Sequence, residues 1–189
     1  MKEQLIKYIK EVSTVTDEEL EKIISYFNSL DVEKNELLVL PGQTTQRMYF
    51  ICNGCLRIFF ITEEGQEATR YLGFESNFVT ALSSFVLNEP SLEFVQALEP
   101  TELLYISRKD FYHLLESIPN WGSFYRHYME MAYVTNTKRL MSFLTQNATE
   151  RYKHLLDTNP KVAQRLSNKI VSSYLNISQE TLSRVKSKT

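Results

Sequence analysis

The sequence predicts an α+β protein with N-terminal helices, an antiparallel β-roll or jelly roll, a long helix and a helical C-terminal domain. Three observations support this prediction. Apolar residues recur at helical spacing over residues 2–29, and short β-rich runs separated by Gly, Asn and Pro occupy residues 36–107. From Arg108 the helical spacing returns and continues toward the end of the chain. Helices are therefore expected on both sides of a central region of strands.

The N-terminal helical region contains a second start signal. Leu5 and Ile9 belong to one apolar stripe, and Leu20 and Ile24 belong to another. Between the stripes, Thr16 is followed by three acidic residues, which are stabilising at the positive end of a helix dipole. A helix is therefore expected to begin at Thr16.

The strand-rich region is divided by turn signals. A Glu-Glu-Gly sequence at 63–65 lies between two β-rich runs and predicts a tight hairpin, with Gly65 at positive φ. The Asn-Gly pair at 53–54 predicts another turn. Many short strands at even spacing are typical of an antiparallel sandwich, roll or jelly roll. The apolar stretch at residues 78–87 fits either a short helix or a strand.

A long helix is predicted over residues 121–145, after a shorter helix that Ser107 caps and Pro119 ends. Its apolar positions are more numerous than one face of a monomer needs. The helix packs on the roll alone or also pairs with a second subunit, and we favour the second interpretation. The residues expected in this pairing are Phe124, Tyr128, Met131 and Thr135.

The charge is unevenly distributed along the chain. The formal net charge is −2, but residues 1–137 hold 11 basic and 20 acidic residues, whereas residues 138–189 hold 10 and 3. The last quarter therefore carries +7 and predicts a polyanionic partner. No run of about 18 apolar residues exists, so no membrane partner is expected, and the first residues lack the apolar stretch of a signal peptide. A cytoplasmic location is expected.

The residues that could support metal or redox chemistry are few. Cys52 and Cys55 have C-x-x-C spacing, which fits a redox pair or half of a zinc site. They lie in a strand–turn–strand pattern, no second Cys pair exists, and the three His residues are spread along predicted helices. We interpret both cysteines as free thiols in a reducing compartment. A metal enzyme on a cupin-type roll would need His on the strands, so we expect no metal, no cofactor and no enzyme activity.

Two short amphipathic segments near the C-terminus are joined by a tight turn. The two helices of a DNA-binding helix-turn-helix cross steeply, so the first needs a small residue where they touch, which Ser172 provides. The turn needs a residue that tolerates the left-handed conformation, and Asn176 fits. Apolar residues occur at the offsets needed to fill the crossing: Val171, Leu175, Ile177, Leu182 and Val185. This agreement predicts a helix-turn-helix.

The second of these helices presents the side chains that read DNA bases. Ser178 falls at its N-cap, and Arg184 can form a bidentate contact with a guanine edge. Glu180 can accept a hydrogen bond from cytosine, or it can simply stabilise the helix N-terminus. The other outward residues are Gln179 and Ser183, and the expected phosphate contacts are Lys169, Lys186 and Lys188.

At this point the chain resembles the Crp/Fnr family of bacterial transcription regulators over essentially its whole length. The segment SQETLSRVK is similar to that family's recognition helix, which implies DNA contacts for Gln179, Glu180 and Arg184, with Ser178 and Thr181 beside them. The resemblance implies a cyclic-nucleotide-binding-type roll, a homodimer on double-stranded DNA, and RNA polymerase as a further partner. The expected domains are a sensor roll at 1–119, a dimerisation helix at 120–146 and a DNA-binding domain at 147–189.

The family's ligand cassette is not present. Thr80-Ala81 stands where the resemblance implies Gly-Glu, and Ser91-Leu92 stands where it implies the Arg-Ser pair that holds a cyclic phosphate. We therefore expect no tight binding of cyclic AMP. Two cysteines are too few for the family's iron–sulfur version, which needs about four. Arg57 and Arg70 are candidates to line a pocket for another small anionic effector, or are surface strand residues.

Two readings of the function remain. The first is a homodimeric, sequence-specific DNA-binding regulator, in which an unidentified effector in the roll acts on the DNA-binding domain. The second is a ligand-binding or scaffolding roll that has lost DNA binding, suggested by the altered cassette and the short tail after the recognition helix. The segment before the helix-turn-helix looks helical, so the usual winged strands are expected to be reduced or absent.

Overall fold

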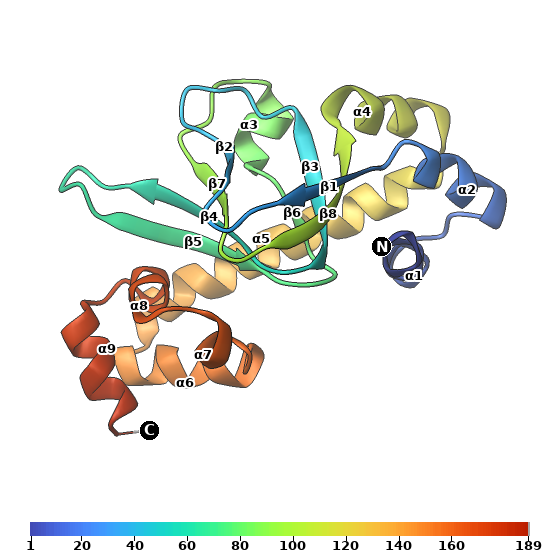
Figure 1. Cartoon of the computed structure of the whole chain (residues 1–189). Helices are drawn as coiled ribbons and strands as arrows, with labels where there is room; N and C mark the ends of the chain where they lie inside the picture. Colours follow the sequence, from blue (N-terminus) through green and yellow to red (C-terminus); the bar gives the residue numbers. More distant parts are fainter. Residues whose placement is uncertain (189) are drawn as a thin grey trace. The chain divides into compact units, whose positions relative to one another are not determined.

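The computed structural model describes residues 1–188, which form two compact units (Figure 1). The first unit consists of Met1–Ile58 and Leu72–Glu130. The second consists of Phe59–Tyr71 and the chain from Met131 onward. The division falls within the long helix and assigns a β-hairpin to the second unit. The expected boundaries at residues 119 and 146 therefore do not coincide with it.

The N-terminal region forms two helices, α1 (Lys2–Val12) and α2 (Asp17–Ser25). Thr16 caps α2 as expected. Its hydroxyl accepts the backbone N–H of Glu19 at 3.2 Å, and the Glu19 carboxylate accepts the backbone N–H of Thr16 at 2.8 Å. This reciprocal capping box satisfies two backbone donors that a helix start otherwise leaves unpaired.

The strands form two four-stranded sheets. One has the order β1 (Asn28–Val32), β8 (Thr101–Ser107), β3 (Arg47–Asn53) and β6 (Phe78–Val79), with antiparallel neighbours. The other has the order β2 (Leu37–Val39), β7 (Phe94–Ala97), β4 (Leu56–Ile61) and β5 (Glu67–Gly73). These sheets confirm the predicted antiparallel roll.

Strand β1 was missed by the sequence prediction, which extended the helical region to residue 29. Helix α2 ends at Ser25, and the chain then pairs along β8, with Leu30 opposite Leu103. Only Val32 of this strand is buried, so its side chains show no clear period-two pattern. Long-range pairing with β8, which no local pattern encodes, determines its conformation.

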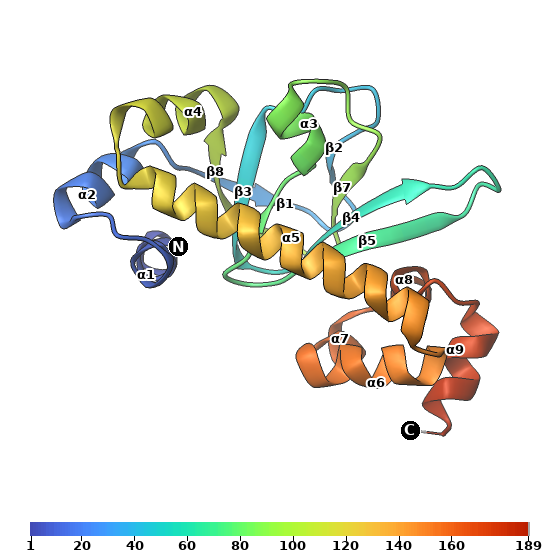
Figure 2. The ribbon, with the colours of Figure 1, turned by 180° about the vertical axis from the view of Figure 1, so that it is seen from behind.

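The ambiguous stretch at residues 78–87 contains both kinds of structure. Strand β6 is followed by the short helix α3 (Leu82–Leu87), which ends at Asn88 in the left-handed conformation with φ of 58°. Helices α4 (Arg108–Ser117) and α5 (Trp121–Thr145) follow, and α5 has the predicted bounds. Figure 2 shows α5 as one continuous helix. The Ser107 hydroxyl accepts the backbone N–H of Asp110 at 3.0 Å, which confirms the predicted cap of α4.

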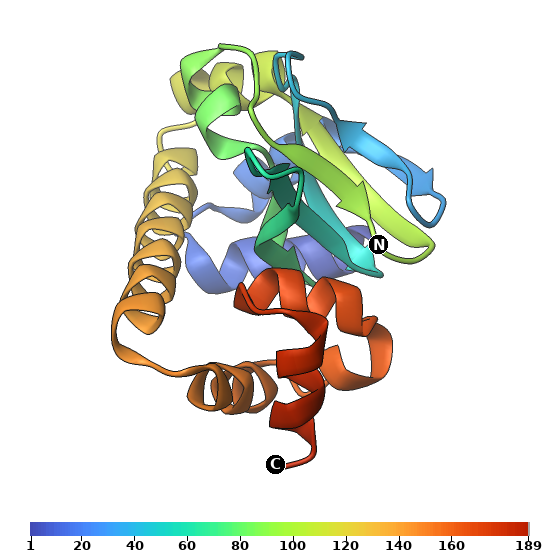
Figure 3. The same cartoon turned by 90° about the vertical axis from the view of Figure 1, so that its left-hand side faces the viewer.

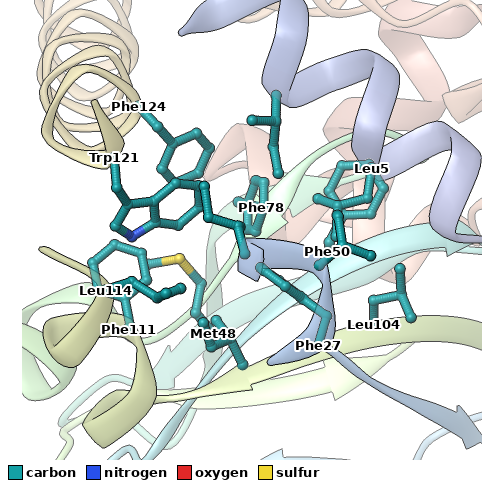
Figure 4. Close-up of a cluster of buried hydrophobic side chains, with 14 of the residues drawn as sticks. Leu5, Phe27, Met48, Phe50, Phe78, Leu104, Phe111, Leu114, Trp121 and Phe124 are labelled. Carbon is teal, nitrogen blue, oxygen red and sulfur yellow. The ribbon is translucent and has the colours of Figure 1, made fainter. Parts of the chain in front are cut away.

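Aromatic side chains dominate the core of the first unit (Figure 4). Trp121 and Phe124, at the start of α5, stack with ring centroids 4.2 Å apart. The ring centroid of Phe78 lies 5.1 Å from that of Phe124 and 5.0 Å from that of Phe50. Because Phe124 is fully buried in its own chain, its predicted place in a subunit interface is wrong. The first turns of α5 are thus anchored in the first unit.

None of the helices among the described residues is long and apolar enough to cross a membrane.

Both predicted turns are present, with Gly54 at φ of 106° and Gly65 at φ of 75°. A Cβ atom added to Gly54 would lie 2.8 Å from the backbone Cα of Thr101, whereas one added to Gly65 would meet nothing within 4 Å. An added side chain would therefore be strained by the positive φ at both positions, but it would overlap a neighbouring residue only at Gly54.

Replacing Gly54 with Ala is expected to destabilise the protein by about 2–5 kcal/mol, because backbone strain and displacement of Thr101 add together. Gly65→Ala should cost about 1 kcal/mol, since it introduces strain alone. Denaturant unfolding of the two variants measures the difference. Equal losses would show that the contact with Thr101 contributes nothing.

Candidate nucleic-acid interface

The C-terminal part of the second unit is helical. It contains α6 (Ala148–Thr158), α7 (Val162–Arg165), α8 (Asn168–Leu175) and α9 (Gln179–Lys186). Between Gln146 and Lys188 the structure has no strand, as expected for a head without wing strands. We refer to α6–α9 as the head.

Helices α8 and α9 form the predicted helix-turn-helix. Asn176 has φ of 51° and ψ of 54°, the left-handed conformation that the sequence requires of it. The backbone N–H groups of Asn176 and Ile177 both donate to the carbonyl of Ser172, so the last turn of α8 is closed. The Ser178 hydroxyl then accepts the backbone N–H of Thr181 at 3.1 Å and caps α9.

Four of the five apolar residues predicted to fill the crossing of the two helices are buried, and Ile177 is half-buried. Figure 3 shows α8 and α9 at a steep angle to each other. Ser172 is 5% exposed and its hydroxyl donates to the Lys169 carbonyl, so a small side chain lies where the helices approach. The apolar residues buried at the crossing are Val171, Leu175, Leu182 and Val185. This packing fixes the direction of α9.

The expected base-reading side chains are exposed on α9. They are Gln179, Glu180, Ser183 and Arg184. One Arg184 Nη donates to the Thr181 hydroxyl at 3.1 Å, which places the guanidinium along the helix surface. A hydrogen bond from the Ser178 side chain holds the pKa of the Glu180 carboxyl below its usual range, so this carboxylate stays ionised.

The three predicted phosphate-binding lysines differ in their surroundings. Lys188 is exposed after the end of α9, and Lys186 Nζ donates to Asn168 Oδ1 at 2.6 Å. Lys169 forms an ion pair with Glu67, with Nζ 2.8 Å from a carboxylate oxygen. Glu67 belongs to β5, so one of the lysines predicted to contact phosphate is paired with an acidic side chain of the hairpin.

Sequence reasoning missed Arg139, which organises the second unit. Its guanidinium donates to the Thr69 carbonyl of β5 at 2.8 Å and to the Tyr174 carbonyl of α8 at 2.7 Å. It also lies 4.0 Å from the ring centroid of Tyr174 and 4.8 Å from that of Phe143. Burial lowers the pKa of Arg139. In the sequence it is one basic residue among several, with no local pattern that marks it.

The second half of α5 exposes apolar side chains. Exposed residues recur there at alternating spacings of three and four, which is the spacing of a coiled-coil seam. These residues are Val134, Thr137, Met141 and Leu144. Tyr133 and Leu140 flank this seam and are 73% and 59% exposed. Arg139 lies on the opposite side of the helix, toward the hairpin and α8. We refer to Val134, Thr137, Met141 and Leu144 as the α5 seam.

The predicted dimer residues lie on a different side of α5. Phe124 is buried, and the half-buried Tyr128 contacts the rings of Phe78 and Phe124. Met131 and Thr135 are exposed. The expected stripe therefore changes role along the helix, because its upstream aromatic residues complete the core.

The predicted effector residues differ in their surroundings. The Thr80 hydroxyl donates to the Arg47 carbonyl, Ser91 donates to the Glu93 carbonyl, and the neighbouring Ala81 is buried. Leu92 is 84% exposed. Arg57 is 4% exposed and donates from Nε and Nη to Gln96 Oε1, so its reading as a surface residue is wrong. Arg70, in the second unit, donates to Asn136 at 3.5 Å.

Both cysteines are buried thiols outside any disulfide. Burial raises the pKa of the Cys52 thiol, which disfavours the reactive thiolate. Among the described residues, no group of three His, Cys, Asp or Glu side chains could hold a metal ion.

Comparisons with known proteins agree with this architecture. A family model described as the cyclic nucleotide-binding domain matches residues 29–118. The fold also matches the c-di-GMP responsive global regulator CLP of Xanthomonas campestris, with 16% identity, a TM-score of 0.73, and 92% and 91% of the two chains covered. The chain has the fold of the Crp/Fnr-type regulators. No curated protein matches it.

Two further solved structures share this Crp/Fnr-type fold. FixK2 of Bradyrhizobium japonicum is 14% identical, with a TM-score of 0.72, and the match covers 86% of this chain and 83% of that one. The catabolite activator protein of Thermus thermophilus is 22% identical, with a TM-score of 0.59 and coverage of 92% and 83%. These matches extend over both the roll and the C-terminal helices.

The left-handed turn of the helix-turn-helix can be tested by substitution. Asn176→Gly should leave stability nearly unchanged, because Gly adopts this conformation without strain. Asn176→Val should cost about 2 kcal/mol, since a β-branched residue is strained there. Thermal unfolding of both variants measures the difference, and a Val variant as stable as the Gly variant would contradict the assigned turn.

Proposed function

We propose that this protein is a homodimeric, sequence-specific DNA-binding transcription regulator of the Crp/Fnr type. One observation carries the proposal. A helix-turn-helix with a capped second helix exposes Gln179, Glu180, Ser183 and Arg184 on one surface. These side chains can accept from and donate to base edges in the major groove, which is wide enough to admit an α-helix.

The charge of the last quarter of the chain supports DNA as the partner. Residues 138–189 carry a net charge of +7, whereas the rest of the chain carries −9. Lys186 and Lys188 lie at the C-terminal end of α9, where they would contact phosphates and set the register of the helix. The acidic remainder of the chain would limit non-specific contact elsewhere on the molecule.

Dimerisation is supported by the α5 seam. Met141 and Leu144 are 50% and 72% exposed, and a second copy of α5 packed against them would remove this apolar surface from water. Two heads related by a two-fold axis would place their recognition helices in successive major grooves, about 34 Å apart. The DNA target would then be close to palindromic.

An effector bound in the roll would control the head. We propose a small ligand other than cyclic AMP, since the Thr80 and Ser91 hydroxyls are engaged by backbone carbonyls and Leu92 replaces a polar cassette residue. The buried Arg57 is a candidate to interact with an anionic group of that ligand. The effector acts if it binds one arrangement of the protein more tightly than another.

The base-reading role of Arg184 gives a direct test. Arg184→Ala should lose about 1–3 kcal/mol of discrimination at one base pair of a selected DNA site. Lys188→Ala should weaken binding to all sequences and reduce the slope of log K against log salt by about 0.9. Lys22→Ala removes the same charge from α2 and is the matched control. Competition binding on a randomised duplex library provides the measurement.

Two outcomes of that experiment would count against the proposal. Unchanged base preference in Arg184→Ala would remove Arg184 from base readout. Failure of the wild-type protein to bind any duplex at low salt would favour a roll protein that has lost DNA binding.

The α5 seam can be tested in the same way. Met141→Glu places two carboxylates near the proposed two-fold axis and removes apolar contact, so the protein should become monomeric at micromolar concentration. Thr135→Glu adds the same charge to an exposed position of α5 outside the seam and should leave the dimer intact. Sedimentation equilibrium measures both. A dimer that dissociates only in Thr135→Glu would place the interface on the side of Met131 and Thr135 instead.

A further inference from the structure

We propose that the hairpin joining β4 and β5 is an acidic clasp that competes with DNA phosphates for the head and so weakens DNA binding. We define the acidic clasp as residues Thr62–Glu67, which include three glutamates. The proposal rests on the proposed DNA-binding function and adds its regulation. All the groups that carry it lie within the second unit.

Two side-chain contacts join the clasp and the adjoining residues of β5 to α8. The Glu67 carboxylate pairs with Lys169 at 2.8 Å, with side chains 24% and 62% exposed. Two residues further along β5, the Thr69 hydroxyl lies 2.6 Å from the Ser173 hydroxyl, and Thr69 is 1% exposed. The hairpin therefore contacts the first helix of the helix-turn-helix through one part-buried neutral contact and one more exposed ionic contact.

Arg139 joins the same two elements through their backbones. Its guanidinium donates to the Thr69 carbonyl and to the carbonyl of Tyr174, which belongs to the last turn of α8. This arrangement fixes β5 beside α8 independently of the Glu67 pair. Because the inner contacts are fixed, the outer ion pair can open and close without separating the hairpin from the head.

The clasp also faces the start of the recognition helix. Gln66 and Glu67 line a hollow of about 510 Å³ together with Ser178, Gln179 and Glu180. Glu63 and Glu64 lie exposed in the tight turn that Gly65 closes. The Glu67 carboxylate is thus placed near the surface that the proposed function assigns to DNA.

Competition follows from the chemistry of Lys169. The Glu67 carboxylate neutralises the charge of the Lys169 ammonium and repels an approaching phosphate, so the attraction between Lys169 and DNA is reduced while the pair is closed. An exposed ion pair is weak, so it reduces DNA affinity by a modest factor and does not prevent binding. The effect should weaken as salt screens both interactions.

The test compares Glu67→Gln with Glu63→Gln, which removes the same charge from an exposed position of the same turn. Glu67→Gln should raise affinity for a non-specific duplex by about three- to tenfold at low salt and steepen the slope of log K against log salt by up to about 0.9, because one more phosphate contact is gained. Glu63→Gln should change affinity less than twofold and leave the slope unchanged. Titrations of the full-length protein with a labelled duplex at several salt concentrations provide the data.

A double-mutant cycle links the effect to the ion pair. In a Lys169→Gln background, Glu67→Gln should change affinity no more than Glu63→Gln does. If Glu67→Gln and Glu63→Gln change DNA affinity equally in the wild-type background, the clasp proposal is wrong, whereas the proposed DNA-binding function still stands. A gain that persists without Lys169 would overturn it too. If no variant binds any duplex at low salt, the proposed function fails, and the clasp fails with it.

Discussion

The arrangement of the second unit depends on one half-buried guanidinium. Arg139 extends from α5 and donates to main-chain carbonyls of two other elements, Thr69 of β5 and Tyr174 of α8. Both acceptors are backbone atoms, so the contact depends on where these elements run and not on which side chains they carry. A charged donor that loses part of its hydration is stabilised by such partners, because an unpaired charge away from water is costly. Hairpin, α5 and α8 are therefore held to one mutual arrangement.

The helix-turn-helix was the part of the molecule best predicted from the sequence, because its requirements are local. The small Ser172, the left-handed Asn176 and the cap at Ser178 each follow from residue chemistry within a few positions. The bounds of α5 and the two tight turns were predicted for the same reason. Such features need no knowledge of what packs against them.

The predictions from the sequence were wrong where residues distant in the chain determine the conformation or burial of a residue. Strand β1 exists because it pairs with β8, some seventy residues away along the chain. Phe124 has the spacing of an interface residue, but its ring packs against Phe78 and Trp121 in the core. Arg57 carries no sign in the sequence of its burial beside Gln96. In each case the local pattern was compatible with two environments, and tertiary contacts selected one.

The change of role along α5 has a consequence for how the protein can evolve. Its first turns supply rings to the roll, and the α5 seam begins only after Glu130, where the second unit also begins. Anchoring and the proposed subunit pairing thus use successive segments of the same helix and share no side chain. Either property can drift under mutation while the other is preserved. A single helix in this way behaves as two modules joined by an uninterrupted backbone.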